Sequence, residues 1–278
     1  QIQTGCDHRC TFCIIPYGRG NSRSVPMARV CEQIKILLEK GFKEIVLSGV
    51  DLTSYGNDLI EKPTLGKLIK RIFKDVKKLE RLRLSSLDAI EIDKDLIDII
   101  CHEKRLMPHL HLSIQSGDNI ILKRMKRRHL REDVIKLCEN LKKFRNNMVF
   151  GADIIAGFPT ETKEMFKNTK KILDECDLTY LHIFPYSNRP NTPASKMPQI
   201  SKEVVKERAK ILRNKANERM KIFLKNQINK THRVLFEKQS EGHSENFIPI
   251  ISKSKHRIGD IVSLKGKYIN NEKLIAQA

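Results

Sequence analysis

Short apolar segments that alternate with amphipathic ones constrain the fold of this 278-residue chain more than any other feature. The candidate strands are residues 44–49, 81–86, 109–115, 148–155 and 180–184, with a first strand near residues 2–3. Helical patterns occupy residues 28–40, 65–77, 95–102 and 162–176, and a broken helical region runs to residue 144. Strands that alternate with helices are typical of βα units in a parallel sheet. About six units predict an α/β fold that is an open, partial βα barrel.

Small and polar residues follow the candidate strands. Ligands of such folds bind at the carboxyl ends of the parallel strands, so these residues should share one site. The candidate segments are Ser48–Gly49, Ser85–Ser86, Gln115–Ser116–Gly117, residues 153–159 and residues 185–189. Gln115 and Ser116 could hydrogen-bond a ribose or a carboxylate, or they could simply complete a turn.

Three cysteines, Cys6, Cys10 and Cys13, stand close together near the start of the chain. Thiolates are soft ligands that select zinc, copper(I) or an iron–sulfur cluster. A structural zinc ion takes four ligands, and a cubane cluster is usually held by four thiolates, so three thiolates leave one iron of such a cluster open. The alternatives are a zinc site completed by His8 or a remote ligand, and three unconnected thiols.

The remaining cysteines are scattered singly, at positions 31, 101, 138 and 176. An odd total of seven cysteines without a framework of pairs predicts a reducing compartment, and we expect a cytoplasmic protein. The sequence contains no apolar run long enough to span a membrane, and we expect no membrane partner.

The pattern changes in the last quarter of the chain. Residues 201–227 form one long helical pattern rich in Lys and Arg, and short strand patterns follow at residues 233–237, 246–251, 260–264 and 273–276. Several short strands with glycines between them predict a small antiparallel β-barrel. We therefore predict two domains, residues 1–229 with the core and a connecting helix, and residues 230–278 with the barrel.

The formal net charge of +20, from 53 Lys and Arg against 33 Asp and Glu, favours a polyanionic partner such as nucleic acid. The densest basic run covers residues 123–131, next to a predicted strand end. Candidate RNA-binding residues are Lys123, Arg124, Arg127, Arg128 and, in a later segment, Arg189. The alternative is a solvated helix face in a lysine-rich chain.

The spacing C-x3-C-x-aromatic-C of Cys6, Cys10 and Cys13 resembles the signature of the radical S-adenosylmethionine (radical SAM) enzymes. The resemblance implies a [4Fe–4S] cluster on the three cysteines, whose open iron takes the amino and carboxylate groups of S-adenosylmethionine. No catalytic residue beyond the cluster ligands is implied. It also implies that Phe12 lies near the cluster and the adenine, and that Ser48 and Gly49 lie where the family binds the amino group.

Two further stretches resemble one branch of that family, the methylthiotransferases. They are Asp153 to Thr162, which contains Gly157, and Phe184 to Ala194. Asp153 and Gly157 are candidate cofactor-binding residues on this basis. The Pro185-Tyr186-Ser187 form is most similar to members that act on threonylcarbamoyladenosine in tRNA, and the segment after residue 230 resembles their RNA-binding TRAM domain.

The resemblance implies insertion of a methylthio group at C2 of an N6-threonylcarbamoyladenosine beside the anticodon. The implied partners are the tRNA anticodon stem-loop and an electron donor such as flavodoxin or ferredoxin. A second [4Fe–4S] cluster is expected on an N-terminal domain that this chain lacks, so the chain should cleave S-adenosylmethionine without completing the reaction. The alternatives are an isopentenyladenosine methylthiotransferase, a ribosomal-protein aspartate methylthiotransferase and a non-catalytic RNA-binding zinc protein.

Overall fold

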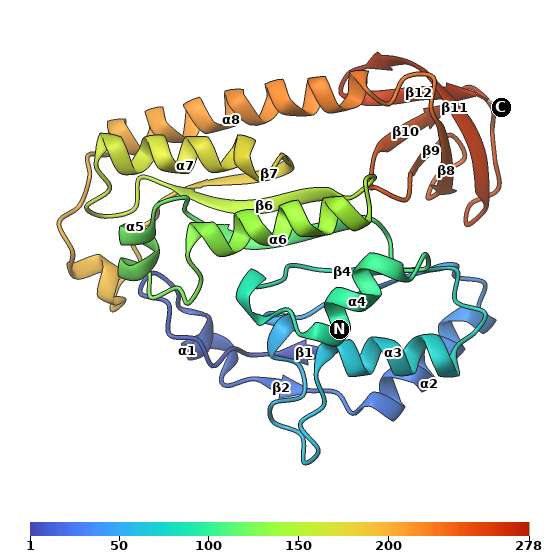
Figure 1. The fold of residues 1–278 in the computed structure, drawn as a ribbon, viewed down its shortest axis with the longest axis horizontal. Coiled ribbons are helices and arrows are strands. Elements are labelled where there is room, and N and C mark those ends of the chain that lie inside the picture. Colours follow the sequence, from blue (N-terminus) through green and yellow to red (C-terminus); the bar gives the residue numbers. More distant parts are fainter. Residues whose placement is uncertain (278) are drawn as a thin grey trace.

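The structure, a computed structural model that describes residues 1–277, is an α/β core followed by a small closed β-barrel (Figure 1). The helices are α1 (Ile15–Arg19), α2 (Met27–Glu39), α3 (Leu65–Asp75), α4 (Lys94–His102), α5 (Asn119–Arg124), α6 (Arg131–Phe144), α7 (Lys163–Glu175) and α8 (Lys202–Lys225). The core strands are β1 (Gln3–Thr4), β2 (Arg23–Ser24), β3 (Glu44–Leu47), β4 (Arg81–Leu84), β5 (His109–Gln115), β6 (Val149–Ala156) and β7 (Leu178–Pro185). The predicted alternation of strands and helices is confirmed.

The core strands form an open sheet system. β3 pairs in parallel with β4, and β5, β6 and β7 pair in parallel in that order. Isolated parallel bridges, Leu82 with Leu106 and Leu87 with Leu112, link the two groups. The predicted first strand does not join them as a parallel partner, because β1 pairs antiparallel with β2. Among residues 1–277 the core therefore has five parallel strands rather than about six, and β7 is an edge of its sheet.

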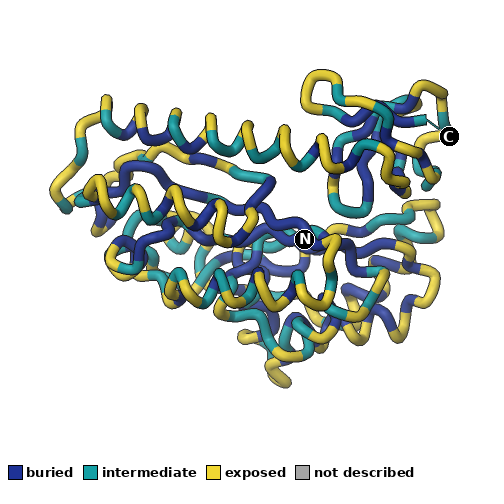
Figure 2. The backbone as a smooth tube through the Cα atoms, turned by 45° about the horizontal axis from the view of Figure 1, so that its top comes forward, coloured by how far each residue is buried: buried dark blue, intermediate teal, exposed yellow. Residues whose placement is uncertain are grey.

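The longer helices, α2, α3, α4, α6, α7 and α8, each bury apolar residues on one side. In α3 the side chains of Leu68, Ile69 and Ile72 are fully buried, and the Thr64 hydroxyl caps the helix by accepting from the Lys67 amide. In α8 the buried residues Val205, Ala209 and Leu212 lie on one side. Figure 2 shows the exposed residues of this long helix on its outward side, above the buried strands. Among residues 1–277, no helix is both long and apolar enough to cross a membrane.

The C-terminal barrel closes in the order β10-β12-β11-β8-β9. Its strands are β8 (Thr231–Phe236), β9 (Glu241–His243), β10 (Pro249–Ser252), β11 (Ile261–Asn270) and β12 (Lys273–Gln277). The pairs are antiparallel except that β10 and β12 pair in parallel, which the sequence pattern did not predict. β9 was also missed, because three residues are too few to show a period.

The barrel packs against the amino ends of the core strands. The Arg83 guanidinium of β4 donates to the Ser244 and Glu245 carbonyls, at 2.7 and 2.9 Å. Glu44, at the start of β3, accepts from Arg83 and from His243 of the barrel at 2.7 and 2.9 Å. The barrel therefore lies at the end of the core opposite to the carboxyl ends of the strands.

Candidate active site

The cysteine loop follows β1 and is held by backbone hydrogen bonds from three directions. The Cys6 amide donates to the Gly20 carbonyl, and the Thr11 amide donates to the Met125 carbonyl, both at 3.1 Å. The Ala194 amide donates to the Thr11 carbonyl at 2.9 Å. Gly5 starts the loop with a φ of 73°, and a Cβ there would lie 2.0 Å from the Asn21 carbonyl oxygen. Only glycine fits this turn.

Replacing Gly5 with alanine should therefore disturb the cysteine loop. We expect the variant to bind less iron than the wild type after anaerobic reconstitution, since left-handed backbone costs a non-glycine residue roughly 1–3 kcal/mol before the clash is counted. Gly18→Ala is the matched control, because a Cβ at Gly18 meets nothing within 4 Å. Equal iron content in the two variants would contradict this account of the loop.

The three cysteines line one cavity of about 260 Å³ at the carboxyl ends of the strands. Four of the predicted cofactor-binding residues line the same cavity, namely Phe12, Gly49, Gln115 and Asp153. Gln115 has a φ of 68°, a left-handed conformation that non-glycine residues adopt rarely and often at functional sites.

The other three predicted cofactor-binding residues do not line this cavity, as far as the described residues define it. The Ser48 carbonyl accepts from the Ile2 amide at 2.9 Å. The Ser116 side chain is fully buried, 3.2 Å from the Thr169 hydroxyl. Gly157 packs under α8, where a Cβ would lie 2.7 Å from Val205 Cγ2. These three residues pack around the strand ends and do not face the cavity.

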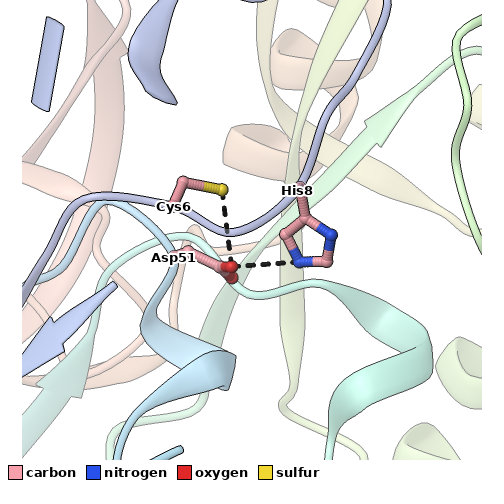
Figure 3. A group of neighbouring side chains, drawn as sticks. All are labelled: Cys6, His8 and Asp51. Atoms are coloured by element: carbon pink, nitrogen blue, oxygen red, sulfur yellow. Dashed lines mark hydrogen bonds and ion pairs between the residues drawn. The ribbon is translucent and has the colours of Figure 1, made fainter. Parts of the chain in front are cut away.

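Cys6 belongs to a polar group at one side of the cavity, shown in Figure 3. Its thiol donates to Asp51 Oδ2 at 3.6 Å, and His8 Nε2 lies 3.0 Å from the same oxygen. Burial and the nearby Asp51 carboxylate raise the pKa of Cys6 to about 12. Burial and Cys10 also raise the pKa of Cys13. A metal that binds these sulfurs must therefore displace protons.

Arg127 brings a positive charge close to Cys10. Its guanidinium donates to Cys10 Sγ at 3.8 Å, to Asp88 Oδ2 at 2.8 Å and to the Ser113 carbonyl at 2.7 Å. Its side chain is only 8% exposed. Arg127 is thus buried beside the cysteine loop, although the sequence placed it among the candidate RNA-binding cations.

The other candidate RNA-binding residues differ in exposure. Lys123, Arg128 and Arg189 are exposed. Arg124 is half-buried, and its guanidinium donates to the Thr160 hydroxyl at 2.8 Å. Arg128 forms an ion pair with Glu91 beside His8. Lys123 and Arg189 thus expose their charges to solvent, Arg128 is exposed but already paired, and the contact of these cations with RNA stays a prediction.

The three thiols can be compared with the metal sites proposed from the sequence, and Cys6 also lies with His8 and Asp51 in a group that could hold a single ion. The Zn–S bond of about 2.3 Å would draw three thiolates to within about 3.8 Å of one another. In the described residues the three sulfur atoms do not all lie within 4.8 Å of one another. A cubane iron–sulfur cluster held by thiolates is larger than a single ion. Three thiolates around one cavity fit a cluster with one open iron.

Sequence reasoning missed several residues of the site. Asp51 and Asp88 each stand three residues or fewer beyond a strand-end segment that was singled out, Ser48–Gly49 and Ser85–Ser86. Extending each of these two segments by two residues would have included Asp51 and Asp88. His111 and His182 also contact Asp153, and their only sequence signal is their position on neighbouring strands.

Comparison with known proteins agrees with this geometry. The sequence profile of the Radical SAM superfamily matches residues 1–173. A threonylcarbamoyladenosine tRNA methylthiotransferase MtaB of Rickettsia prowazekii (strain Madrid E) is 53% identical over 94% of this chain and 62% of its own length. A tRNA-2-methylthio-N(6)-dimethylallyladenosine synthase of Neorickettsia sennetsu (strain ATCC VR-367 / Miyayama) is 34% identical over 95% of this chain and 57% of its own length.

The fold is also similar to solved structures. Coproporphyrinogen III oxidase (HemN) from Escherichia coli, a radical SAM enzyme, aligns with a TM-score of 0.53 and 15% identity over 84% of this chain and 60% of that one. The present chain spans 57–62% of the length of the two curated relatives named above. Because the superfamily profile covers more than half of the residues, including the cysteine loop and the cavity, the chain belongs to the radical SAM superfamily.

Proposed function

We propose that this chain is part of an enzyme that inserts a methylthio group at C2 of N6-threonylcarbamoyladenosine in tRNA. The observation that carries the proposal is the 53% identity to the R. prowazekii MtaB, which extends over 94% of the chain. The three cysteines around one cavity support it, because C2 of adenine is unactivated and its hydrogen can be removed only by a strong radical. Residues 1–229 would form the radical SAM core and residues 230–278 a TRAM-like barrel.

The residues of the cavity have distinct roles in this proposal. Cys6, Cys10 and Cys13 would hold a [4Fe–4S] cluster, which together with S-adenosylmethionine supplies the chemistry of hydrogen-atom removal. Gly49 lines the cavity without a side chain, so a ligand can reach the backbone there. The Arg127 cation beside Cys10 offsets the negative charge of the thiolates, and Asp88 fixes the position of Arg127.

The partners follow from the same proposal. Exposed Lys123, Arg128 and Arg189 would contact the phosphates of an anticodon stem-loop by charge. An electron donor such as flavodoxin or ferredoxin would reduce the cluster. A second [4Fe–4S] cluster on a further domain would provide the sulfur, so completion of the reaction is expected only in the full-length protein.

Mass spectrometry of tRNA nucleosides tests the proposal. Cells that lack the full-length protein should lose 2-methylthio-N6-threonylcarbamoyladenosine, and the unmethylthiolated nucleoside should accumulate in its place. The 2-methylthio derivative of dimethylallyladenosine should be unchanged. Loss of the dimethylallyl derivative instead would favour the activity named for the N. sennetsu relative, and no change in either nucleoside would refute both.

A further inference from the structure

The position of Arg127 is fixed by the turn that ends helix α5. The Lys126 amide donates to the Lys123 carbonyl at 3.0 Å, and the Arg127 amide donates to the Leu122 carbonyl at 2.9 Å. Lys126 has a φ of 62°, so the turn is a Schellman motif with Lys126 in the left-handed position. This motif reverses the chain after the helix, and Arg127 is the first residue beyond the left-handed position.

The same turn is hydrogen-bonded to the cysteine loop. The Thr11 amide donates to the Met125 carbonyl at 3.1 Å, and the Thr11 hydroxyl donates to the Arg124 carbonyl at 2.8 Å. Thr11 directly follows Cys10 in the sequence. The separation of Arg127 from Cys10 is therefore determined by backbone contacts between the two segments, and not only by the arginine side chain.

The guanidinium of Arg127 has three acceptors, and one of them is a cysteine sulfur. Nη1 donates to Cys10 Sγ at 3.8 Å, while Nη2 donates to Asp88 Oδ2 at 2.8 Å and to the Ser113 carbonyl at 2.7 Å. The side chains of Arg127 and Asp88 are only 8% and 6% exposed. Burial would raise the pKa of Asp88, but the hydrogen bond of His129 and the charge of Arg127 lower it overall. Arg127 and Asp88 therefore form a buried ion pair whose positive end faces Cys10.

A buried cation at this place acts on any cluster that the cysteines hold. The reduction potential of an iron–sulfur cluster depends on its net charge, on hydrogen bonds to its sulfurs and on solvent exposure. Reduction adds one negative charge, so a cation that donates to a ligand sulfur stabilises the reduced cluster more than the oxidised one, and the low dielectric of a buried site strengthens this effect.

Arg127 is the one cationic side chain among residues 1–277 that donates to a sulfur of the three cysteines. The other two sulfurs have different partners. The Cys6 thiol donates to Asp51, and Cys13 Sγ accepts from the Ile15 amide at 3.4 Å. The nearest carboxylates, Asp51 and Asp88, have the opposite charge and oppose the effect of Arg127.

We propose that Arg127 raises the reduction potential of the cluster on Cys6, Cys10 and Cys13, and that Asp88 limits this increase. The inference rests on the proposed function, because it requires the cluster. Arg127 acts through Cys10, so it is a positioning residue. Removing the charge of Arg127 makes the cluster harder to reduce, whereas removing the charge of Asp88 makes it easier to reduce. A loss of packing would not give opposite shifts for the two members of one ion pair.

A redox titration of the reconstituted chain without S-adenosylmethionine tests this inference. Titanium(III) citrate gives one electron to each cluster and is oxidised to titanium(IV), and the EPR signal of the reduced cluster gives the midpoint potential. Arg127→Gln should shift the equilibrium about tenfold toward the oxidised cluster, the value of one charge-assisted hydrogen bond and about 59 mV for a one-electron couple. Arg127→Lys, which keeps the charge, should shift it less. Asp88→Asn should shift it in the opposite direction.

Arg145→Gln is the matched control. Arg145 is half-buried and donates to the Ile100 and Glu103 carbonyls, but it precedes β6 at the amino ends of the strands and does not line the cavity. This variant should keep the wild-type potential. An unchanged potential in Arg127→Gln overturns the inference, and so does a shift that occurs only after S-adenosylmethionine is added, because Arg127 would then act on that molecule and not on the cluster.

The sign of the Asp88→Asn shift gives an independent result. A shift in the same direction as that of Arg127→Gln overturns the inference, and if Arg127→Gln does not retain iron, the sign for Asp88→Asn decides the matter alone. Iron content is measured on every sample. A wild type that takes up no cluster contradicts the proposed function, whereas a wild type that holds a cluster whose potential the variants do not shift contradicts only this inference.

Discussion

Replacing Cys10 with alanine should abolish the formation of 5′-deoxyadenosine from S-adenosylmethionine by the reconstituted chain. Cys10 lines the cavity with the two other cysteines, and its sulfur accepts from Arg127 at 3.8 Å. Loss of a residue behind a metal ligand commonly costs 10–100-fold in activity, so loss of the ligand itself should exceed about 100-fold. Chromatographic quantification of deoxyadenosine, with iron content measured on the same sample, gives the result.

Cys101→Ala is the control for this experiment. Cys101 is also half-buried but lies on α4, outside the residues that line the cavity. The variant should form deoxyadenosine at the wild-type rate. Deoxyadenosine formation that persists in Cys10→Ala would show that the cysteines of this loop do not hold the reactive group.

Replacing the buried Glu44 with alanine should cause a large decrease in the free energy of unfolding. Glu44 is buried between Arg83 of β4 and His243 of the barrel, and Arg81 lies 3.5 Å away. Removing the carboxylate leaves two buried guanidinium groups without an anion, which typically costs about 3–5 kcal/mol. Denaturant titration should show this loss. Glu164→Ala, which removes an exposed ion pair with Lys167, should change stability by less than about 0.5 kcal/mol.

The effect of Glu44→Ala should depend on pH. Burial raises the pKa of Glu44, but hydrogen bonds from His243 and Arg83 outweigh it and lower the pKa from 4.5 to about 2. A carboxyl whose folded-state pKa is depressed contributes its stabilisation above its unfolded pKa and loses it as the pH falls toward the folded value. The difference between wild type and variant should therefore be full at pH 7 and shrink below pH 4.5. A difference that stays constant down to pH 2.5 would contradict the ion-pair account.

The sequence predicted those parts of the fold that depend on local periodicity. Each of these elements can be recognised within its own segment of the sequence. The signals are the apolar stripes of α3 and α8 and the short apolar runs of β3 and β6. Since the carboxyl ends of parallel strands meet at one edge, the strand ends also predicted much of the site. Gln115 and Asp153 line the cavity for this reason.

What the sequence did not predict depends on contacts between distant segments. The alternation of Arg81 and Arg83 with leucines in β4 is typical of a half-exposed strand, yet both arginines are buried because carbonyl groups of the barrel accept their hydrogen bonds. Ser116 looked like a ligand contact but turns its hydroxyl toward α7. Arg127 belongs to a basic run whose other members are mostly exposed, and only the tertiary fold brings it to Cys10.

The most direct test of the central claim is the identity of the metal that the three cysteines bind. After anaerobic reconstitution with iron and sulfide, the chain should hold about four iron and four sulfide ions per molecule, as one cubane cluster requires, with a brown charge-transfer absorption. Reduction in the presence of S-adenosylmethionine should then yield deoxyadenosine. Stoichiometric zinc at the cysteines, with no iron uptake and no cleavage of S-adenosylmethionine, would contradict the account.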